Sequence, residues 1–112
     1  MDATTQFFQG LEARGHEPRL EKVTATLRFD LTNGKRTARW LVAIDKGDID
    51  VSHRNVKADC IVRADKTLFD GIASGEVNAF AAALRGAIGI EGNTEVLVLF
   101  QRLFPSPPES TS

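Results

Sequence analysis

The sequence contains few of the residues from which metal and redox sites are built. Among 112 residues there is one cysteine, Cys60, and there are two histidines, His16 and His53. A single cysteine cannot form an internal disulfide, so we expect a reducing, cytoplasmic location. A zinc site needs three or four cysteine, histidine or carboxylate ligands, and one cysteine with two distant histidines makes a poor set. We therefore predict no metal and no cofactor.

An excess of charge of one sign is also missing, as is any long apolar run. The chain has 14 Lys and Arg against 15 Asp and Glu, and the basic residues are scattered. Nucleic-acid binding needs a concentrated basic field, so we expect no nucleic-acid partner. No apolar run approaches the roughly 20 residues of a membrane span, and the N-terminus does not resemble a signal peptide.

Catalytic motifs are missing from the sequence as well. Neither histidine lies in a nucleophile motif such as Gly-x-Ser-x-Gly. Asp45, Asp48 and Asp50 resemble a calcium loop only loosely, because the other ligands of such a loop are lacking, and a solvated turn is the simpler interpretation. His53 is expected to be a hydrogen-bonded side chain at the rim of the core. We therefore predict that the protein is not an enzyme.

What the sequence does have is a strict alternation of apolar and polar residues. Apolar residues stand at every second position in 23–31 and again in 38–44. A period of two predicts strands with one dry face and one wet face. Two tight-turn signals, Asn33-Gly34 and Lys46-Gly47, predict three antiparallel strands in a meander. On one face, the register expected from these turns pairs Phe29–Ala38, Leu27–Trp40, Ala25–Val42, Val23–Ile44, Ile44–Ile49 and Val42–Val51.

The rest of the chain predicts further strands and helices within one domain. Asn93 can cap the last helix and Pro105 can stop it. The predicted helices are 3–14, 66–74, 77–84 and 94–104, and the further strands are 58–63 and 86–90. The fold class is therefore α+β. We place the domain at residues 3–104 and a disordered, Pro- and Ser-rich tail at residues 105–112.

The last predicted helix carries more apolar surface than one packing contact requires. Residues 96–100 are all apolar, whereas a helix on a packed core needs only one apolar stripe. Its second side needs another helix, a bound apolar ligand or a second subunit. Trp40 presents a similar choice between a solid core and the lining of a ligand cavity. Phe69, Phe80 and Phe100 share that choice.

The order of these elements resembles the lipid-binding domain of sterol carrier protein 2 (SCP2). The resemblance covers roughly residues 5–104 and implies a five-stranded, mostly antiparallel sheet with helices covering one face. It also implies an apolar tunnel between sheet and helices for a fatty acyl chain, acyl-CoA or a sterol, without catalysis. The segments that carry it are Val23–Leu31 with its hairpin, Trp40–Gly47, Ala58–Asp65 before a helix with Phe69, Gly75–Phe80 and Leu84–Asn93.

The resemblance predicts a protein that binds or transfers apolar lipids. The C-terminal Ser110-Thr111-Ser112 differs from the Ser-Lys-Leu-type peroxisomal signal of some family members, so we expect a bacterial cytoplasmic protein. The alternative is an interaction module with a solid core, accessory to a lipid-related enzyme, which forms a homodimer through the C-terminal helix. The residues expected to touch lipid are Leu27, Phe29, Trp40, Val42, Phe69, Phe80, Leu84, Phe100 and Leu103.

Overall fold

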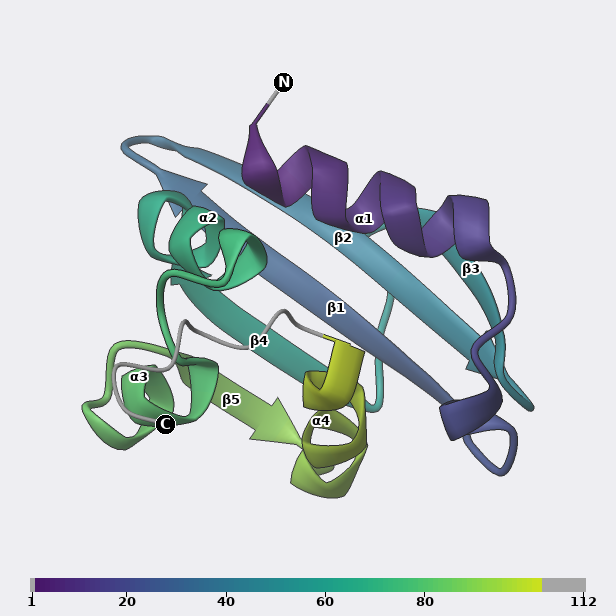
Figure 1. The fold of residues 1–112 in the computed structure, drawn as a ribbon. Helices are drawn as coiled ribbons and strands as arrows, with labels where there is room; N and C mark the ends of the chain where they lie inside the picture. Colours follow the sequence, from purple (N-terminus) through teal and green to yellow (C-terminus); the bar gives the residue numbers. More distant parts are fainter. Residues whose placement is uncertain (1, 104–112) are drawn as a thin grey trace.

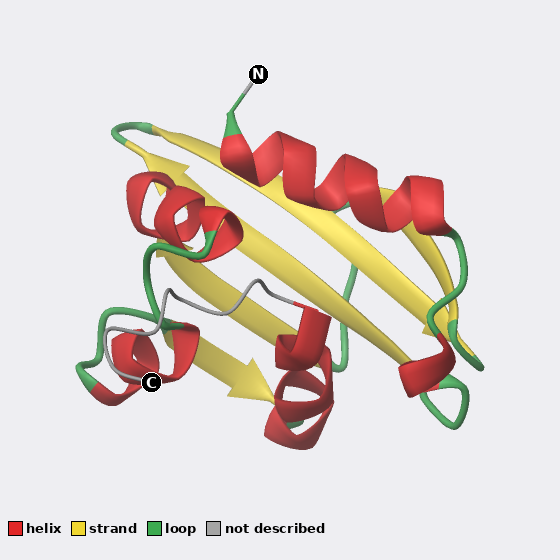
Figure 2. Ribbon diagram, viewed as in Figure 1, coloured by secondary structure: helices red, strands yellow, loops and turns green. Residues whose placement is uncertain are grey.

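The computed structural model describes residues 2–103, which form an α+β fold with the helices on one face of a sheet (Figures 1 and 2). The strand order is β3-β2-β1-β4-β5, with β1 and β4 parallel and the other neighbouring pairs antiparallel. The strands are β1 (Thr24–Asn33), β2 (Arg36–Asp45), β3 (Asp48–Ser52), β4 (Cys60–Asp65) and β5 (Gly89–Gly92). The helices are α1 (Ala3–Arg14), η1 (Pro18–Leu20), α2 (Lys66–Ser74), α3 (Ala79–Leu84), α4 (Thr94–Phe100) and η2 (Gln101–Leu103).

The predicted fold class and the meander of β1, β2 and β3 are confirmed, but the first register is wrong by two residues. Phe29 pairs with Trp40 instead of Ala38, because the two-residue loop is Gly34-Lys35 rather than Asn33-Gly34. Gly34 has a φ of 65° at the first loop position, where a type II′ turn needs a positive φ. The observed pairs also include Leu27–Val42 and Ala25–Ile44, in place of Leu27–Trp40, Ala25–Val42 and Val23–Ile44.

A shift of two residues leaves every side chain on its predicted face, so the apolar surface survives the error. The second turn is predicted correctly. Lys46 and Gly47 both have positive φ, 52° and 91°, as a type I′ turn requires. Ile44 faces Ile49 there, and the neighbouring apolar pair is Val42–Val51.

Of the four predicted helices, the first two have the predicted bounds and the last two differ. The helices expected at 3–14 and 66–74 have those bounds. The third begins at Ala79, because the Asn78 side chain accepts a hydrogen bond from Ala81 N and caps it. The last helix is α-helical from Thr94 to Phe100 and continues as η2. Its predicted end at Phe104 and the tail expected at 105–112 lie outside the described residues.

The two later strands are displaced from their predicted positions. The strand expected at 58–63 is β4, and the one expected at 86–90 is β5. Gly86 has a φ of 77° and turns the chain after α3, so strand pairing starts only at Gly89. Ile88 therefore precedes β5 instead of lying within it, although it still faces the apolar side of the sheet.

The connection between β3 and β4 crosses the face of the sheet opposite the helices. β3 forms one edge and β4 lies beyond β1, so residues 53–59 pass behind the sheet (Figure 1). Arg28 fixes this crossing, because its Nη1 donates to Val56 O at 3.0 Å while Nε and Nη2 donate to Asp30. Leu41 and Asp30 are buried on this face. The second face is thus polar but partly covered.

An aromatic cluster forms the centre of the core between sheet and helices. It joins Phe8 of α1, Phe29 of β1, Phe69 of α2 and Phe100 of α4, all fully buried. The Phe8 ring stacks on Phe69 at 5.7 Å and on Trp40 at 4.6 Å between centroids. Such ring pairs stabilise the core beyond the area they bury. None of the helices within residues 2–103 is long and apolar enough to cross a bilayer.

Candidate functional site

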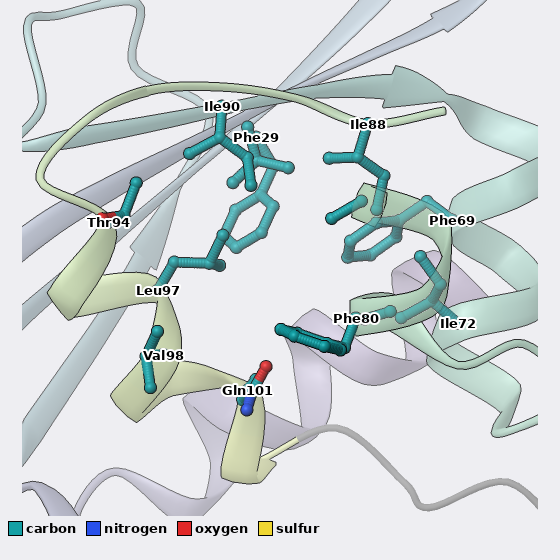
Figure 3. Close-up of a pocket in the computed structure, with 13 residues that line it drawn as sticks. Phe29, Phe69, Ile72, Phe80, Ile88, Ile90, Thr94, Leu97, Val98 and Gln101 are labelled. Atoms are coloured by element: carbon teal, nitrogen blue, oxygen red, sulfur yellow. The ribbon is translucent and has the colours of Figure 1, made fainter. Parts of the chain in front are cut away.

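A pocket of about 210 Å³ lies over β4 and β5, beside α2 and between α3 and α4 (Figure 3). Strands β1, β4 and β5 supply its floor, the three helices supply its walls, and the segment before β5 adds Ile88. Its lining is almost entirely apolar, as is usual for sites that hold small molecules. The lining residues are Phe29, Val62, Phe69, Ile72, Ala79, Phe80, Ala83, Ile88, Ile90, Thr94, Leu97, Val98 and Gln101.

One end of the pocket is closed and the other is open. Phe29 and Phe69 have 0% and 1% of their surface exposed, so they form the closed end against the aromatic cluster. Phe80 and Val98 are 61% and 55% exposed, so they form the mouth between α3 and α4. Leu84 lies one helical turn from Phe80 and is 74% exposed. Large apolar side chains exposed together indicate contact with an apolar ligand or surface.

The polar groups of the lining are few and uncharged. Within the described part of the chain, Thr94 and Gln101 are its only polar members, and both are exposed. Among residues 2–103 no group of three or more His, Cys, Asp or Glu is placed to hold a metal ion. Burial, with a smaller effect from Asp59, raises the pKa of the nearby Cys60 thiol, so Cys60 is an unreactive core residue. The arrangement suits retention of an apolar molecule.

Close backbone contacts hold β5 and α4 in position. Gly92 has a φ of 91°, and a Cβ there would lie 2.2 Å from the Asp59 carbonyl oxygen. Asn93 N then donates to Asp59 O at 2.7 Å. The Asn93 side chain accepts a hydrogen bond from Glu95 N and caps α4, as predicted. Glycine is needed at position 92 because both the conformation and the space exclude a side chain.

Three of the residues expected to touch lipid line this pocket: Phe29, Phe69 and Phe80. Four others are buried in the core outside the lining, namely Leu27, Val42, Phe100 and Leu103. Leu84 is exposed beside the mouth, also outside the lining. The structure therefore brings together the aromatic residues of β1, α2 and α3 but not those of β2 and α4.

Trp40 lies away from the pocket, over the half of the sheet that α1 covers. Its ring is stacked on Phe8, and the His53 ring lies 4.2 Å from it between centroids. His53 is exposed, and its Nδ1 lies 2.9 Å from Arg39 O. His53 is thus hydrogen-bonded at the rim of the core, as expected. A shallow hollow of about 220 Å³ beside these rings is lined partly by Glu12, Gln9 and Ser52.

Ten lining residues are missing from the sequence-based set. Some of them could have been identified from the sequence. Leu97 and Val98 belong to the apolar run 96–100, and Ile88 and Ile90 stand at alternate positions of the predicted strand, on its apolar face. Ala79 and Ala83 could not, because an alanine on a helix is equally common in a core, at a surface or beside a ligand. The missing residues are Val62, Ile72, Ala79, Ala83, Ile88, Ile90, Thr94, Leu97, Val98 and Gln101.

Comparison with known proteins relates both the sequence and the fold to one family. A family model described as the SCP-2 sterol transfer family matches residues 5–105. No curated protein sequence matches the chain. The sterol carrier protein domain 2 of Helicoverpa armigera superimposes with a TM-score of 0.76 at 23% identity, covering 98% of this chain and 94% of that one.

Two further solved structures have the same fold. The palmitated SCP2L2 of Aedes aegypti superimposes with a TM-score of 0.71 at 12% identity, covering 97% of this chain and 100% of that one. The sec-alkylsulfatase Pisa1 of Pseudomonas sp. has a TM-score of 0.70 at 22% identity, covering 91% of this chain but 16% of the enzyme. At these identities the superpositions establish a shared fold.

Proposed function

The chain belongs to the SCP-2 sterol transfer family, and from that premise we propose that it binds or transfers apolar lipids without catalysing a reaction. The lipid occupies the pocket between β4, β5 and the helices α2, α3 and α4. The observation that carries this proposal is the pocket itself: about 210 Å³ of apolar space, closed by Phe29 and Phe69 and opening between Phe80 and Val98. The palmitated relative supports an acyl chain as the ligand.

The energetics of an empty pocket favour a bound ligand. Dry cavities cost about 24 cal/mol per Å³, so about 5 kcal/mol is the upper limit for a space of about 210 Å³ that opens to solvent at one end. Domains are stable by only about 5–15 kcal/mol in total. Each methylene moved from water into apolar surroundings contributes about 0.8 kcal/mol in the opposite direction. A bound chain therefore offsets the cost of the cavity and stabilises the fold.

The location and the partner follow from the same proposal. The single cysteine supports a cytoplasmic location. The alternative function is an interaction module, and one observation favours it: Val98 of α4 is exposed beside Phe80 and Leu84. A second copy of the chain could cover this surface and form a homodimer through the C-terminal helix. The similarity to one part of a sec-alkylsulfatase is consistent with an accessory role.

Native mass spectrometry of protein purified without detergent tests the proposal. We expect a mass excess of one lipid per chain, lost on denaturation and recovered in an organic extract. Ala83→Phe places a ring into the pocket and should abolish the excess. Ala81→Phe is the matched control, because Ala81 lies on the same helix outside the lining, so this variant should keep its lipid.

Two results would contradict the proposal. A bare protein mass together with no binding of added fatty acid would contradict the lipid-binding function. Retention of the lipid by Ala83→Phe would contradict its placement in this pocket. A bare mass at twice the chain mass would favour the interaction module.

A further inference from the structure

We propose that the pocket takes one acyl chain end-on, holds roughly its last seven carbons, and excludes the fused rings of a sterol. This inference rests on the proposed function and specifies the ligand class of the same site. It is carried by the volume of the pocket, by its single blind end and by the position of its polar groups.

The volume sets the number of carbons. The pocket holds about 210 Å³, and a methylene group takes up about the volume of one water molecule, roughly 30 Å³. The space therefore fits roughly seven methylenes in a row. A sterol nucleus contains many more carbons in a rigid plate of fused rings, which is too large for this space. A flexible chain can fill the pocket and continue past the mouth.

The blind end limits how far a chain can enter. Phe69 closes it with its ring, and the Phe8 ring is stacked behind at 5.7 Å between centroids, nearly parallel at 2°. Phe29 closes the side, with its ring 5.5 Å from that of Phe69. Interiors packed at this density leave no further room for a methylene. Depth is thus fixed by aromatic rings that belong to the core.

The polar groups set the direction of entry. Thr94 and Gln101 are both exposed, whereas the blind end is formed by phenylalanine rings. A carboxyl or other head group buried there would have no hydrogen-bond partner, which is costly. The chain therefore enters methyl end first. The head group of a chain of roughly eight carbons stays at the mouth near Gln101, and that of a longer chain lies beyond it (Figure 3).

A chain-length series tests the depth. Delipidated protein is titrated calorimetrically with saturated fatty acids of roughly six to sixteen carbons, and with cholesterol as a competitor. We expect Kd to fall about fourfold per added methylene up to roughly eight carbons, counting the carboxyl, and to change little beyond. Cholesterol should not displace a bound ten-carbon chain.

A pair of variants tests the blind end. Phe69→Leu shortens the side chain that closes the pocket, so the break in the series should move to longer chains by roughly one carbon. Phe100→Leu removes an equally buried ring that packs on Phe29 outside the lining. The break should stay in place in this control.

The outcomes separate this inference from the function on which it rests. A fourfold gain per methylene that continues to sixteen carbons would overturn the chain-length limit, and displacement by cholesterol would overturn the exclusion of sterols. Both results would leave lipid binding intact. A break that moves in Phe100→Leu but not in Phe69→Leu would overturn the assignment of the blind end. No binding at any chain length in the wild type would contradict the proposed function itself.

Discussion

The two halves of the sheet are covered in different ways. Over β1, β2 and β3 the 12-residue helix α1 lies lengthwise along the strands (Figure 1). Its Phe8 and Leu11 are buried against the sheet. Over β4 and β5 the cover consists of three shorter helices: α2, with 9 residues, α3, with 6, and α4, with 7. These short helices leave the pocket between them and expose Phe80 and Val98.

The difference shows that the same apolar sheet face can give a solid core or a cavity, depending on the helices above it. A long helix places an apolar residue over the strands at every turn. The short helices α3 and α4, which are separated by β5, cannot do so, and their apolar residues then line a space instead of filling it. We call residues under α1 the packed half and residues around the pocket the open half.

The largest expected effect compares one substitution in the two halves. Phe8→Ala removes a fully buried ring that contacts Phe29, Trp40 and Phe69, and should lower the free energy of unfolding by about 3–5 kcal/mol. Phe80→Ala removes a ring that is 61% exposed, and should change it by only about 0.5 kcal/mol. Chemical denaturation followed by far-UV circular dichroism measures both.

In lipid affinity the order should be reversed, with the larger loss for Phe80→Ala and the smaller loss for Phe8→Ala. Phe80→Ala should weaken binding because Phe80 lines the mouth, while Phe8→Ala should retain binding for as long as it is folded. If Phe8→Ala does not fold, Phe8→Leu should lower the free energy of unfolding in the same direction but by a smaller amount. Equal losses of stability at the two positions would contradict the division into a packed and an open half.

An intermediate effect on stability is expected at the hydrogen bonds that join α1 to α2. Thr4 is buried, and both its hydroxyl and its backbone N–H donate to Asp70 Oδ1, at 2.5 and 3.1 Å. Lys66 Nζ donates to the other oxygen of Asp70 at 3.0 Å. Thr4→Val keeps the shape but removes one donor to a part-buried carboxylate, so we expect a loss of about 1–3 kcal/mol in thermal or chemical unfolding.

The matched control is Thr67→Val, since Thr67 is an exposed residue of α2 and its replacement should change stability by at most about 0.5 kcal/mol. Lipid affinity should be the same in both threonine variants, because neither residue lines the pocket. A drop in affinity for Thr4→Val alone would mean that the position of α1 also shapes the open half.

The sequence predicted the packed half better than the open half, and the reasons are physical. The alternation in β1 and β2 is local, so it identified the dry face without knowledge of the partner strand. It could not fix the register of the first hairpin, because a shift of two residues leaves the pattern unchanged. The register is set by the position of Gly34, which is the first residue of the loop and has a positive φ.

The lining of the pocket was harder to predict because it depends on what the helices fail to cover. Trp40 was a reasonable candidate as the largest apolar side chain, yet Phe8 stacks on it from α1. Ala83 lines the pocket from the short helix α3, and its residue type gives no sign of this. Phe69 was predictable because a large aromatic side chain on the apolar stripe of a helix packs against the sheet, whereas Phe80 lines the mouth and is 61% exposed.

The smallest expected effect concerns an exposed ion pair at the end of the packed half. His16 Nδ1 lies 2.7 Å from Asp48 Oδ1, where the chain leaving α1 meets β3. The hydrogen bond with Asp48 is the main reason that the pKa of His16 is raised above 6.5. Folding therefore favours the protonated imidazole. Its contribution to stability is complete below the unfolded-state pKa of about 6.5 and is lost as pH rises through the folded-state pKa.

Asp48→Asn should remove this contribution, so its stability deficit against the wild type should be larger at about pH 5.5 than at about pH 8.5. The effect is small because both side chains are solvent-exposed. Asp50→Asn makes the same charge change two positions further along β3, at an exposed residue that forms no ion pair with a histidine within residues 2–103. The stability deficit of Asp50→Asn should therefore not vary with pH in this way. If both variants show the same pH dependence, the general charge of β3 is responsible. If only Asp48→Asn shows this pH dependence, the contact between the end of α1 and β3 is electrostatic as well as steric. No ion pair of this kind joins α3 to the sheet within residues 2–103, so the contrast between the two halves includes their electrostatics.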